Sequence, residues 1–378
     1  MNTKKVSIWI FLLLNFNGMV CGQTADNKSS MNFDMEKLAQ TLAKYDYAGQ
    51  FVDGLCSVLQ KSGAGFIDKS GKEIIPCIYD YARVFSEGLA SVKKGDKWGC
   101  IDRTGKTVIP FNYEWVGNFS DGMAAVTVDD KQGFIDRTGK LVIPCIYDPY
   151  CSFSFQSGIA AVYGENGRIG YIDKTGKYVI PPIAYCYEGG EGQVFAPQFS
   201  EGMLALYLKD QGDDDNDPPY GYYDNSGKIA IPRQFEEANN FSDGLACVKK
   251  CDDETGCFYG YIDKSGKEVI PFIFDNGGDF FGGIAKVIKD GKSVFIDKTG
   301  KEISPCTYQY VGKYSEGFIL VMNSEEKYGF INNTGKEIIP CIYDNAYNFS
   351  DGLAKVKKNG VWGLLDKQGK FSAIQKVQ

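Results

Sequence analysis

From Phe51 onward the sequence repeats one unit nine times, and this repeat limits the folds open to the chain. Phe51, Phe85 and Phe119 are 34 residues apart, and insertions lengthen some later units. The units begin at Phe51, Phe85, Phe119, Phe155, Phe199, Phe241, Phe280, Tyr314 and Phe349. A unit this short cannot bury an apolar face of its own, so each unit must pack on its neighbours.

Glycines mark the turns within a unit, and short apolar runs mark the strands. In the third unit Ser120-Asp121-Gly122 predicts a turn, and Asp136 begins a hairpin loop that contains a left-handed glycine. The second strand carries a glycine, which signals a bulge or a close backbone approach. That glycine recurs as Gly65, Gly99, Gly133, Gly170, Gly221, Gly260, Gly329 and Gly363, and Val294 replaces it in the seventh unit. The third strand is expected to end at a proline such as Pro76, which has no amide donor.

The predicted fold is all-β, with about nine three-stranded β-meander repeats in tandem. We expect an open solenoid, because propellers usually close with four to eight four-stranded blades. A closed β-propeller-like ring is the alternative. Residues 31–45 are expected to form one short N-terminal helix that caps the array, with Met35, Leu38 and Leu42 on its apolar face.

The first 22 residues have the pattern of a secretory signal peptide. Two lysines precede an apolar run that is shorter than a membrane-spanning helix, and a cleavage site is expected before Gln23. Lipidation of Cys21 is the alternative, and it would anchor the protein to a membrane surface. The predicted organisation is therefore 1–22 signal peptide, 23–50 polar linker and capping helix, and 51–378 repeat array. The protein is predicted to be exported to the periplasm, cell surface or extracellular space, with no membrane span.

Composition excludes several classes of function. The chain has no histidine, which removes histidine-based catalytic arrangements and histidine metal ligands. Its net charge is −7, so it offers no strongly basic surface for nucleic acid. No cofactor is predicted.

Two insertions lengthen the units between their first and second strands. Asp213, Asp215 and Asp217 alternate as at the start of a calcium loop, but Pro218 stands where the loop requires glycine, so a solvated acidic loop is favoured. In the second insertion Cys251 and Cys257 bound a short loop, and in an oxidising compartment they are predicted as a possible disulfide.

The sequences Lys97-Trp98-Gly99 and Val361-Trp362-Gly363, with the recurrent Phe-Ile-Asp-Lys-Thr-Gly-Lys pattern, resemble the WG-repeat family, also called the KWG repeat. The resemblance covers residues 51–370. It implies an all-β repeat array of bacterial proteins that are often exported, and tryptophan is retained in two of the nine units.

Three hypotheses of function follow. The first is a non-catalytic binding or scaffolding surface for a protein or glycan partner, with aromatic rings in the variable stretch after the third strand. The candidate partner-binding residues there are Trp115, Tyr150, Tyr187, Tyr310 and Tyr347, beside Tyr113; the alternative is that these rings cover the neighbouring unit's core. The second is an envelope-associated glycoside hydrolase using paired carboxylates, although Glu114, Glu165, Glu188, Glu191 and Glu236 show no spacing that implies a pair. The third is a purely structural envelope spacer.

Overall fold

The structure is a computed structural model. It describes residues 34–375 apart from 150–153, 165–167, 185–186, 190–192, 208–219, 253 and 255. The predicted signal peptide, Cys21, Tyr150 and the acidic insertion at Asp213 lie outside the described residues. All described residues belong to one compact unit.

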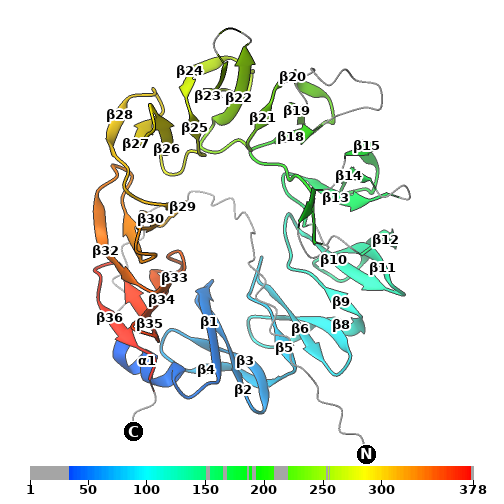
Figure 1. The fold of residues 1–378 in the computed structure, drawn as a ribbon. Helices are drawn as coiled ribbons and strands as arrows, with labels where there is room; N and C mark the ends of the chain where they lie inside the picture. Colours follow the sequence, from blue (N-terminus) through cyan, green and yellow to red (C-terminus); the bar gives the residue numbers. More distant parts are fainter. Residues whose placement is uncertain are drawn as a thin grey trace, which may run out of the picture. The chain divides into compact units, whose positions relative to one another are not determined.

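Nine small antiparallel sheets, here called blades 1 to 9, follow one another around a ring (Figure 1). Blade 1 contains β1 (Tyr47–Val52), β2 (Leu55–Gln60), β3 (Gly63–Asp68) and β4 (Glu73–Tyr79). Blade 2 contains β5 (Tyr81–Ala82), β6 (Leu89–Lys94), β7 (Lys97–Asp102) and β8 (Thr107–Tyr113). Blade 3 contains β9 (Trp115–Val116), β10 (Met123–Val128), β11 (Lys131–Asp136) and β12 (Leu141–Tyr147). Blades 4 and 5 have three described strands each, which are β13 (Ile159–Tyr163), β14 (Ile169–Asp173) and β15 (Tyr178–Ala184), then β18 (Met203–Tyr207), β19 (Tyr220–Asp224) and β20 (Ile229–Phe235). The hairpin of β16 (Tyr187–Gly189) and β17 (Gln193–Phe195) lies between them in sequence.

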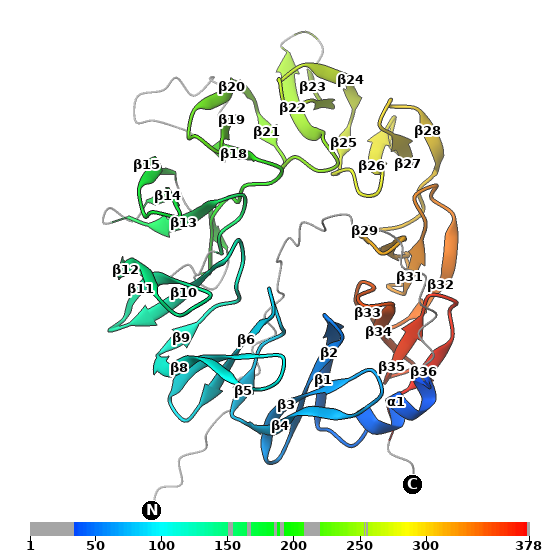
Figure 2. The same ribbon diagram turned by 180° about the vertical axis from the view of Figure 1, so that it is seen from behind.

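The second half of the ring repeats the four-stranded pattern. Blades 6 and 7 contain β21 (Glu237–Ala238), β22 (Ala246–Asp252), β23 (Gly256–Ile262) and β24 (Glu268–Phe274), then β25 (Asn276–Gly277), β26 (Ile284–Lys289), β27 (Lys292–Asp297) and β28 (Glu302–Pro305). Blades 8 and 9 contain β29 (Tyr310–Ser315), β30 (Phe318–Met322), β31 (Tyr328–Ile331) and β32 (Glu337–Tyr343), then β33 (Asn345–Ala346), β34 (Leu353–Lys358), β35 (Val361–Asp366) and β36 (Phe371–Ala373). In each four-stranded blade the first strand lies toward the ring's centre and the fourth at its periphery (Figure 2).

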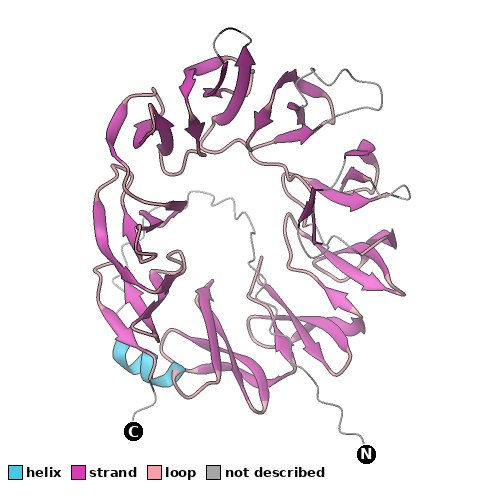
Figure 3. Ribbon diagram, viewed as in Figure 1, coloured by secondary structure: helices cyan, strands magenta, loops and turns pink. Residues whose placement is uncertain are grey.

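The structure confirms an all-β fold of nine units. The expected open solenoid is wrong and the alternative of a closed β-propeller-like ring is confirmed, because the ring is closed. Most blades gain a short fourth strand from the stretch that follows each proline, such as β5 (Tyr81–Ala82). An open solenoid is expected for units of three strands, and the fourth strand removes that expectation. Strands account for nearly all the regular structure (Figure 3). The single helix among the described residues is α1 (Met35–Leu42), shorter than expected, with Asp34 as its N-cap.

In most blades the recurrent Ser-Asp-Gly or Ser-Glu-Gly turn bonds to the next blade. Ser120 Oγ donates to the carbonyl oxygen of Phe155 in blade 4 at 2.6 Å. Asp121 Oδ2 accepts from the backbone N–H of Gly158, also in blade 4, at 2.7 Å. Both Asp121 and Gly122 have positive φ (52° and 78°), as a two-residue hairpin of this type requires. The recurrent turn residues therefore carry contacts between blades as well as the chain reversal.

The same contacts close the ring between blade 9 and blade 1. Ser350 Oγ donates to the carbonyl oxygen of Phe51 at 2.7 Å, and Asp351 accepts from the backbone N–H of Gly54 at 2.5 Å. Lys69 Nζ donates to the carbonyl oxygen of Asp351. Each of these two blades is built from contiguous residues, so no strand is exchanged at the closure.

The second-strand glycine faces a bulge in the outer strand, as its sequence position predicts. In blade 3 the pairing shifts between Gln132 and Phe134, and a Cβ on Gly133 would lie 2.5 Å from the carbonyl oxygen of Ile143. Blade 7 has Val294 in this place, and there Val294 pairs directly with Pro305, where β28 ends. Glycine is therefore needed where the bulge brings the outer strand over the second strand.

The expectation that the third strand ends at proline is wrong for most blades. Strand β4 continues through Pro76 to Tyr79. Because β4 is an edge strand, the missing N–H of Pro76 breaks no ladder hydrogen bond that the sheet needs.

Acid is expected to weaken the fold through the Asp-x-Thr/Ser-Gly loops. The side chain of Asp136 accepts from the Thr138 hydroxyl at 2.6 Å and from two backbone N–H groups, and the Thr138 bond is the largest of the causes that lower its pKa. The pKa is lowered in the same way at Asp102, Asp173, Asp224, Asp263 and Asp297.

Because the folded pKa lies below the unfolded value, this stabilisation is present above about pH 4 and is lost as the pH falls further. Thermal unfolding followed by circular dichroism should show the melting temperature falling below that pH. The melting temperature of the Asp136→Asn variant should fall less on acidification, because asparagine can make the same bonds, as Asn332 does in blade 8. An equal fall in melting temperature on acidification in the variant and the wild-type protein would contradict the role of this carboxylate.

Candidate functional site

The first residue of each inner strand begins a row of neighbouring side chains that crosses the blade. In blade 2 this row is Tyr81, Lys93 and Trp98, which are paired in register on adjacent strands. Side chains directly opposite on adjacent strands share one face of the sheet. The tryptophan of the WG motif is therefore the third member of the row.

On one part of the ring, aromatic members of these rows and side chains next to them form a run of aromatic rings and cations, which we call the aromatic arc. It spans blades 9, 1, 2 and 3 and consists of Tyr347, Trp362, Lys355, Tyr47, Tyr81, Trp98, Arg83 and Trp115. It contains all the tryptophans among the described residues.

In the first half of the arc a buried lysine bridges the closure of the ring. Lys355 Nζ lies 5.1 Å from the ring centroid of Trp362 in its own blade and 4.6 Å from that of Tyr47 in blade 1. It also donates to the carbonyl oxygen of Ala48, and its side chain is 9% exposed. Burial lowers the pKa of Lys355. Tyr347 stacks on Trp362, with centroids 5.8 Å apart.

In the second half an arginine takes the equivalent bridging role. The guanidinium of Arg83 lies 5.4 Å from the ring centroid of Trp98 and 5.2 Å from that of Trp115. Burial lowers the pKa of Arg83. Tyr81 packs against Trp98 at 5.6 Å. Cation–π contacts thus fix the rings of blades 2 and 3 relative to one another.

The two halves meet at Tyr47. Burial raises the pKa of Tyr47, and Tyr347, Cys56 and Tyr81 are close enough to add to the rise. Several rings of the arc remain open to solvent: Tyr47 is 57% exposed, Tyr81 54% and Tyr347 37%. Lys355 is buried, Arg83 is half-buried and the tyrosines are exposed, which makes an aromatic surface with limited conformational freedom to lose on binding.

The structure places two of the predicted partner-binding residues, Trp115 and Tyr347, in the arc. Tyr310 begins β29 in blade 8 and is 45% exposed, and Tyr113 ends β8 and is half-buried. Tyr187 begins β16, its side chain lies outside the described residues, and so does all of Tyr150.

Sequence reasoning missed the rest of the arc. Tyr47 and Tyr81 occupy the same place in their units as Trp115, and this alignment was the available signal. The remaining members are Trp98, Trp362, Arg83 and Lys355.

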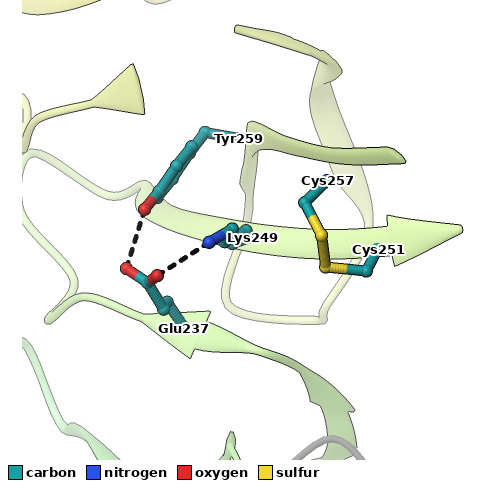
Figure 4. The surroundings of a disulfide bond; sticks show 5 residues. All are labelled: Glu237, Lys249, Cys251, Cys257 and Tyr259. Carbon is teal, nitrogen blue, oxygen red and sulfur yellow. Dashed lines mark hydrogen bonds and ion pairs between the residues drawn. A yellow bond between two sulfur atoms is a disulfide. The ribbon is translucent and has the colours of Figure 1, made fainter. Parts of the chain in front are cut away.

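Blade 6 shows a different use of the same row (Figure 4). Its members are Glu237, Lys249 and Tyr259. Lys249 Nζ lies 2.9 Å from one carboxylate oxygen of Glu237, and the Tyr259 hydroxyl donates to the other at 2.7 Å. The Tyr259 and Lys249 hydrogen bonds lower the pKa of Glu237. Nearby, Cys251 and Cys257 are joined by a disulfide at the end of the β22–β23 hairpin.

The structure describes only some of the candidate carboxylates for a glycoside hydrolase. Glu114 accepts from the backbone N–H of Asp130 at 3.3 Å, and Glu236 lies beside β21. Glu165 and Glu191 are not described, nor is the side chain of Glu188. Within the described ranges no cluster of three or more His, Cys, Asp or Glu residues is placed to hold a metal ion. A hollow between blades 4 and 5, lined in part by Gln156 and Tyr171, has a volume of about 10 Å³, which is room for about one water molecule.

Among the described residues, no helix combines the length and apolar character needed to cross a bilayer.

Comparison with known protein families gives one result that covers most of the chain. The family model described as "WG containing repeat" matches residues 65–98, 98–131, 133–167, 169–183, 220–252, 259–292, 295–326 and 328–362. The comparison with curated proteins returns no match.

Two solved structures are similar at a low level. BamB from Moraxella catarrhalis is 13% identical with a TM-score of 0.37, over 74% of this chain and 94% of BamB. The tricorn protease is 12% identical with a TM-score of 0.25, over 88% of this chain and 39% of the protease. At these scores neither structure carries an argument about this chain.

Proposed function

The chain belongs to the WG-containing repeat family, and from that premise we propose that it is an exported, non-catalytic binding scaffold that engages a protein or glycan partner through the aromatic arc. The observation that carries the proposal is the exposure of Tyr47, Tyr81 and Tyr347 beside tryptophans that contact Lys355 and Arg83. Contiguous exposed aromatic surfaces mark interaction sites more often than single exposed apolar residues do.

Export is supported by two observations. Residues 1–22 have the basic start and apolar run of a signal peptide, and the Cys251–Cys257 disulfide is typical of proteins that mature in an oxidising compartment. We place the protein in the periplasm, at the cell surface or outside the cell.

Co-sedimentation with insoluble envelope material from the native host tests the proposal. Tyr47→Ala/Tyr81→Ala should lower the affinity about tenfold, because two aromatic contacts of ~0.7 kcal/mol each are lost. Asn276→Ala changes the exposed residue at the same strand position in blade 7 and should bind like wild type.

Treating the envelope material with protease beforehand separates a protein partner from a glycan partner. Equal retention of wild type and the double variant would refute binding by the arc. Release of soluble sugars by the wild-type protein would refute the non-catalytic assignment.

A further inference from the structure

We propose that the lysine–tryptophan rows of blades 9 and 2 bind carboxylates of an anionic glycan, a polyuronate, whose sugar rings stack on the exposed tyrosines of the aromatic arc. This inference rests on the proposed function and assigns the chemistry of its partner. It starts from a comparison of equivalent rows within this one ring.

Blade 6 shows how the row treats a carboxylate. Glu237 is held by the ammonium of Lys249 at 2.9 Å and by the hydroxyl of Tyr259 at 2.7 Å, while Lys249 also lies 5.5 Å from the Tyr259 ring centroid. The row therefore combines a cation and an aromatic ring around one anionic group, which the blade supplies itself.

Blades 9 and 2 have the lysine and the aromatic ring without a carboxylate in the row. The row in blade 9 is Asn345, Lys357 and Trp362, with Lys357 Nζ 6.0 Å from the Trp362 centroid. The row in blade 2 begins with Tyr81, followed by Lys93. Lysine is the second member of the rows in blades 2, 6 and 9. In blades 2 and 9 the row holds no carboxylate to balance the lysine charge.

Two acids adjacent to these rows in sequence have partners, and a third, Asp96 in the β6–β7 hairpin of blade 2, is exposed. Asp80 accepts from the backbone N–H of Gly95 at 2.6 Å. Asp344 pairs with Lys327 at 2.6 Å and accepts from the backbone N–H of Gly360 at 2.7 Å, and these contacts lower its pKa, with the charge of Lys357 as a smaller cause. Further lysines follow on the same hairpins, namely Lys94 and Lys97 in blade 2 and Lys358 in blade 9. This part of an otherwise acidic chain is therefore complementary to an anion.

The shape of the arc favours a glycan over an acidic peptide. Peptide side chains are usually anchored in pockets. Tyr47 and Tyr81 are instead more than half exposed on the inner strands, and the hollow described above lies elsewhere, between blades 4 and 5. The apolar face of a sugar ring stacks on an exposed aromatic ring. The run of aromatic rings across blades 9, 1 and 2 suits a linear chain of sugars.

Titration of the full chain with short oligogalacturonate tests the inference, with tryptophan fluorescence as the readout because every described tryptophan lies in the arc. Wild type should bind, and Lys93→Gln/Lys357→Gln should weaken binding by about tenfold for each lysine removed. Lys249→Gln is the matched control: it changes the same row position in blade 6, where Glu237 already occupies the lysine, and binding should be unchanged. Raising the salt concentration should weaken wild-type binding.

Three results would overturn the inference. They are equal binding of a neutral cello-oligosaccharide, equal or tighter binding of an oligoglutamate peptide, and unchanged oligogalacturonate binding by a Lys93→Gln/Lys357→Gln variant that melts like wild type. If oligogalacturonate fails to bind while envelope retention still depends on Tyr47 and Tyr81, this inference fails and the proposed function stands. Loss of both would reject the proposed function as well.

Discussion

A chain that ends at Tyr343, and so lacks blade 9, is expected not to fold as a soluble monomer. Blade 9 covers Phe330 and Ile339 of blade 8, and it also contacts blade 1 through β34. Exposing each fully buried side chain of this size costs about 1.5–3 kcal/mol, and the truncation exposes several of them on the faces of blades 8 and 1 that blade 9 covers. The typical total stability of a folded domain is only about 5–15 kcal/mol. Size-exclusion chromatography with light scattering should show aggregates or open-ended oligomers.

A circular permutant is the control for this truncation. It begins at Asp344 and joins residue 375 to Asp34 through a short linker, which is feasible because α1 packs against β36. It keeps all nine blades, and since no strand is exchanged at the closure it should remain monomeric. A soluble monomeric truncation, melting like the full chain, would show that closure contributes little to stability.

Gly133→Ala is expected to destabilise the protein by about 3 kcal/mol or more, a large effect for one methyl group. The added Cβ would lie 2.5 Å from the carbonyl oxygen of Ile143 and 2.8 Å from the backbone nitrogen of Cys145. Both contacts are to backbone, so no side-chain rotation relieves them. Urea unfolding should show a lower midpoint with an unchanged slope.

Gly360→Ala is the matched control for this substitution. Gly360 has a φ of 80°, and a Cβ there would meet nothing within 4 Å. The free energy of unfolding of the Gly360→Ala variant should fall only by the backbone strain of about 1–2 kcal/mol. Equal losses at Gly133 and Gly360 would mean that the bulge yields to the new methyl group.

The local structure of each unit could be predicted from the sequence because it depends on nearby residues. The left-handed glycines, the strand glycine opposite a bulge and the exception at Val294 all follow from chemistry within one unit. Closure could not be predicted in this way. It depends on the small rotation between neighbouring blades, and on inner strands of two residues such as β5 (Tyr81–Ala82) that carry little pattern of their own.

The candidate site was harder to predict because it is assembled across the closure. Lys355 meets Ala48 over a sequence separation of 307 residues. In an open array these residues would lie at opposite ends of the protein. Trp115 and Tyr347 were identified by their place in the unit, but the cations between the rings gave no periodic signal.

Helix α1 is made first and docks last. Its buried residues are Met35, Leu38 and Leu42. Its main strand contacts are with β35 and β36, the last strands that a ribosome would deliver, although Thr41 also lies against Gly71 of blade 1. During synthesis this helix therefore has no finished surface to rest on. The ring can close and α1 can be covered only after the final blade has emerged, so the first element made waits for the last.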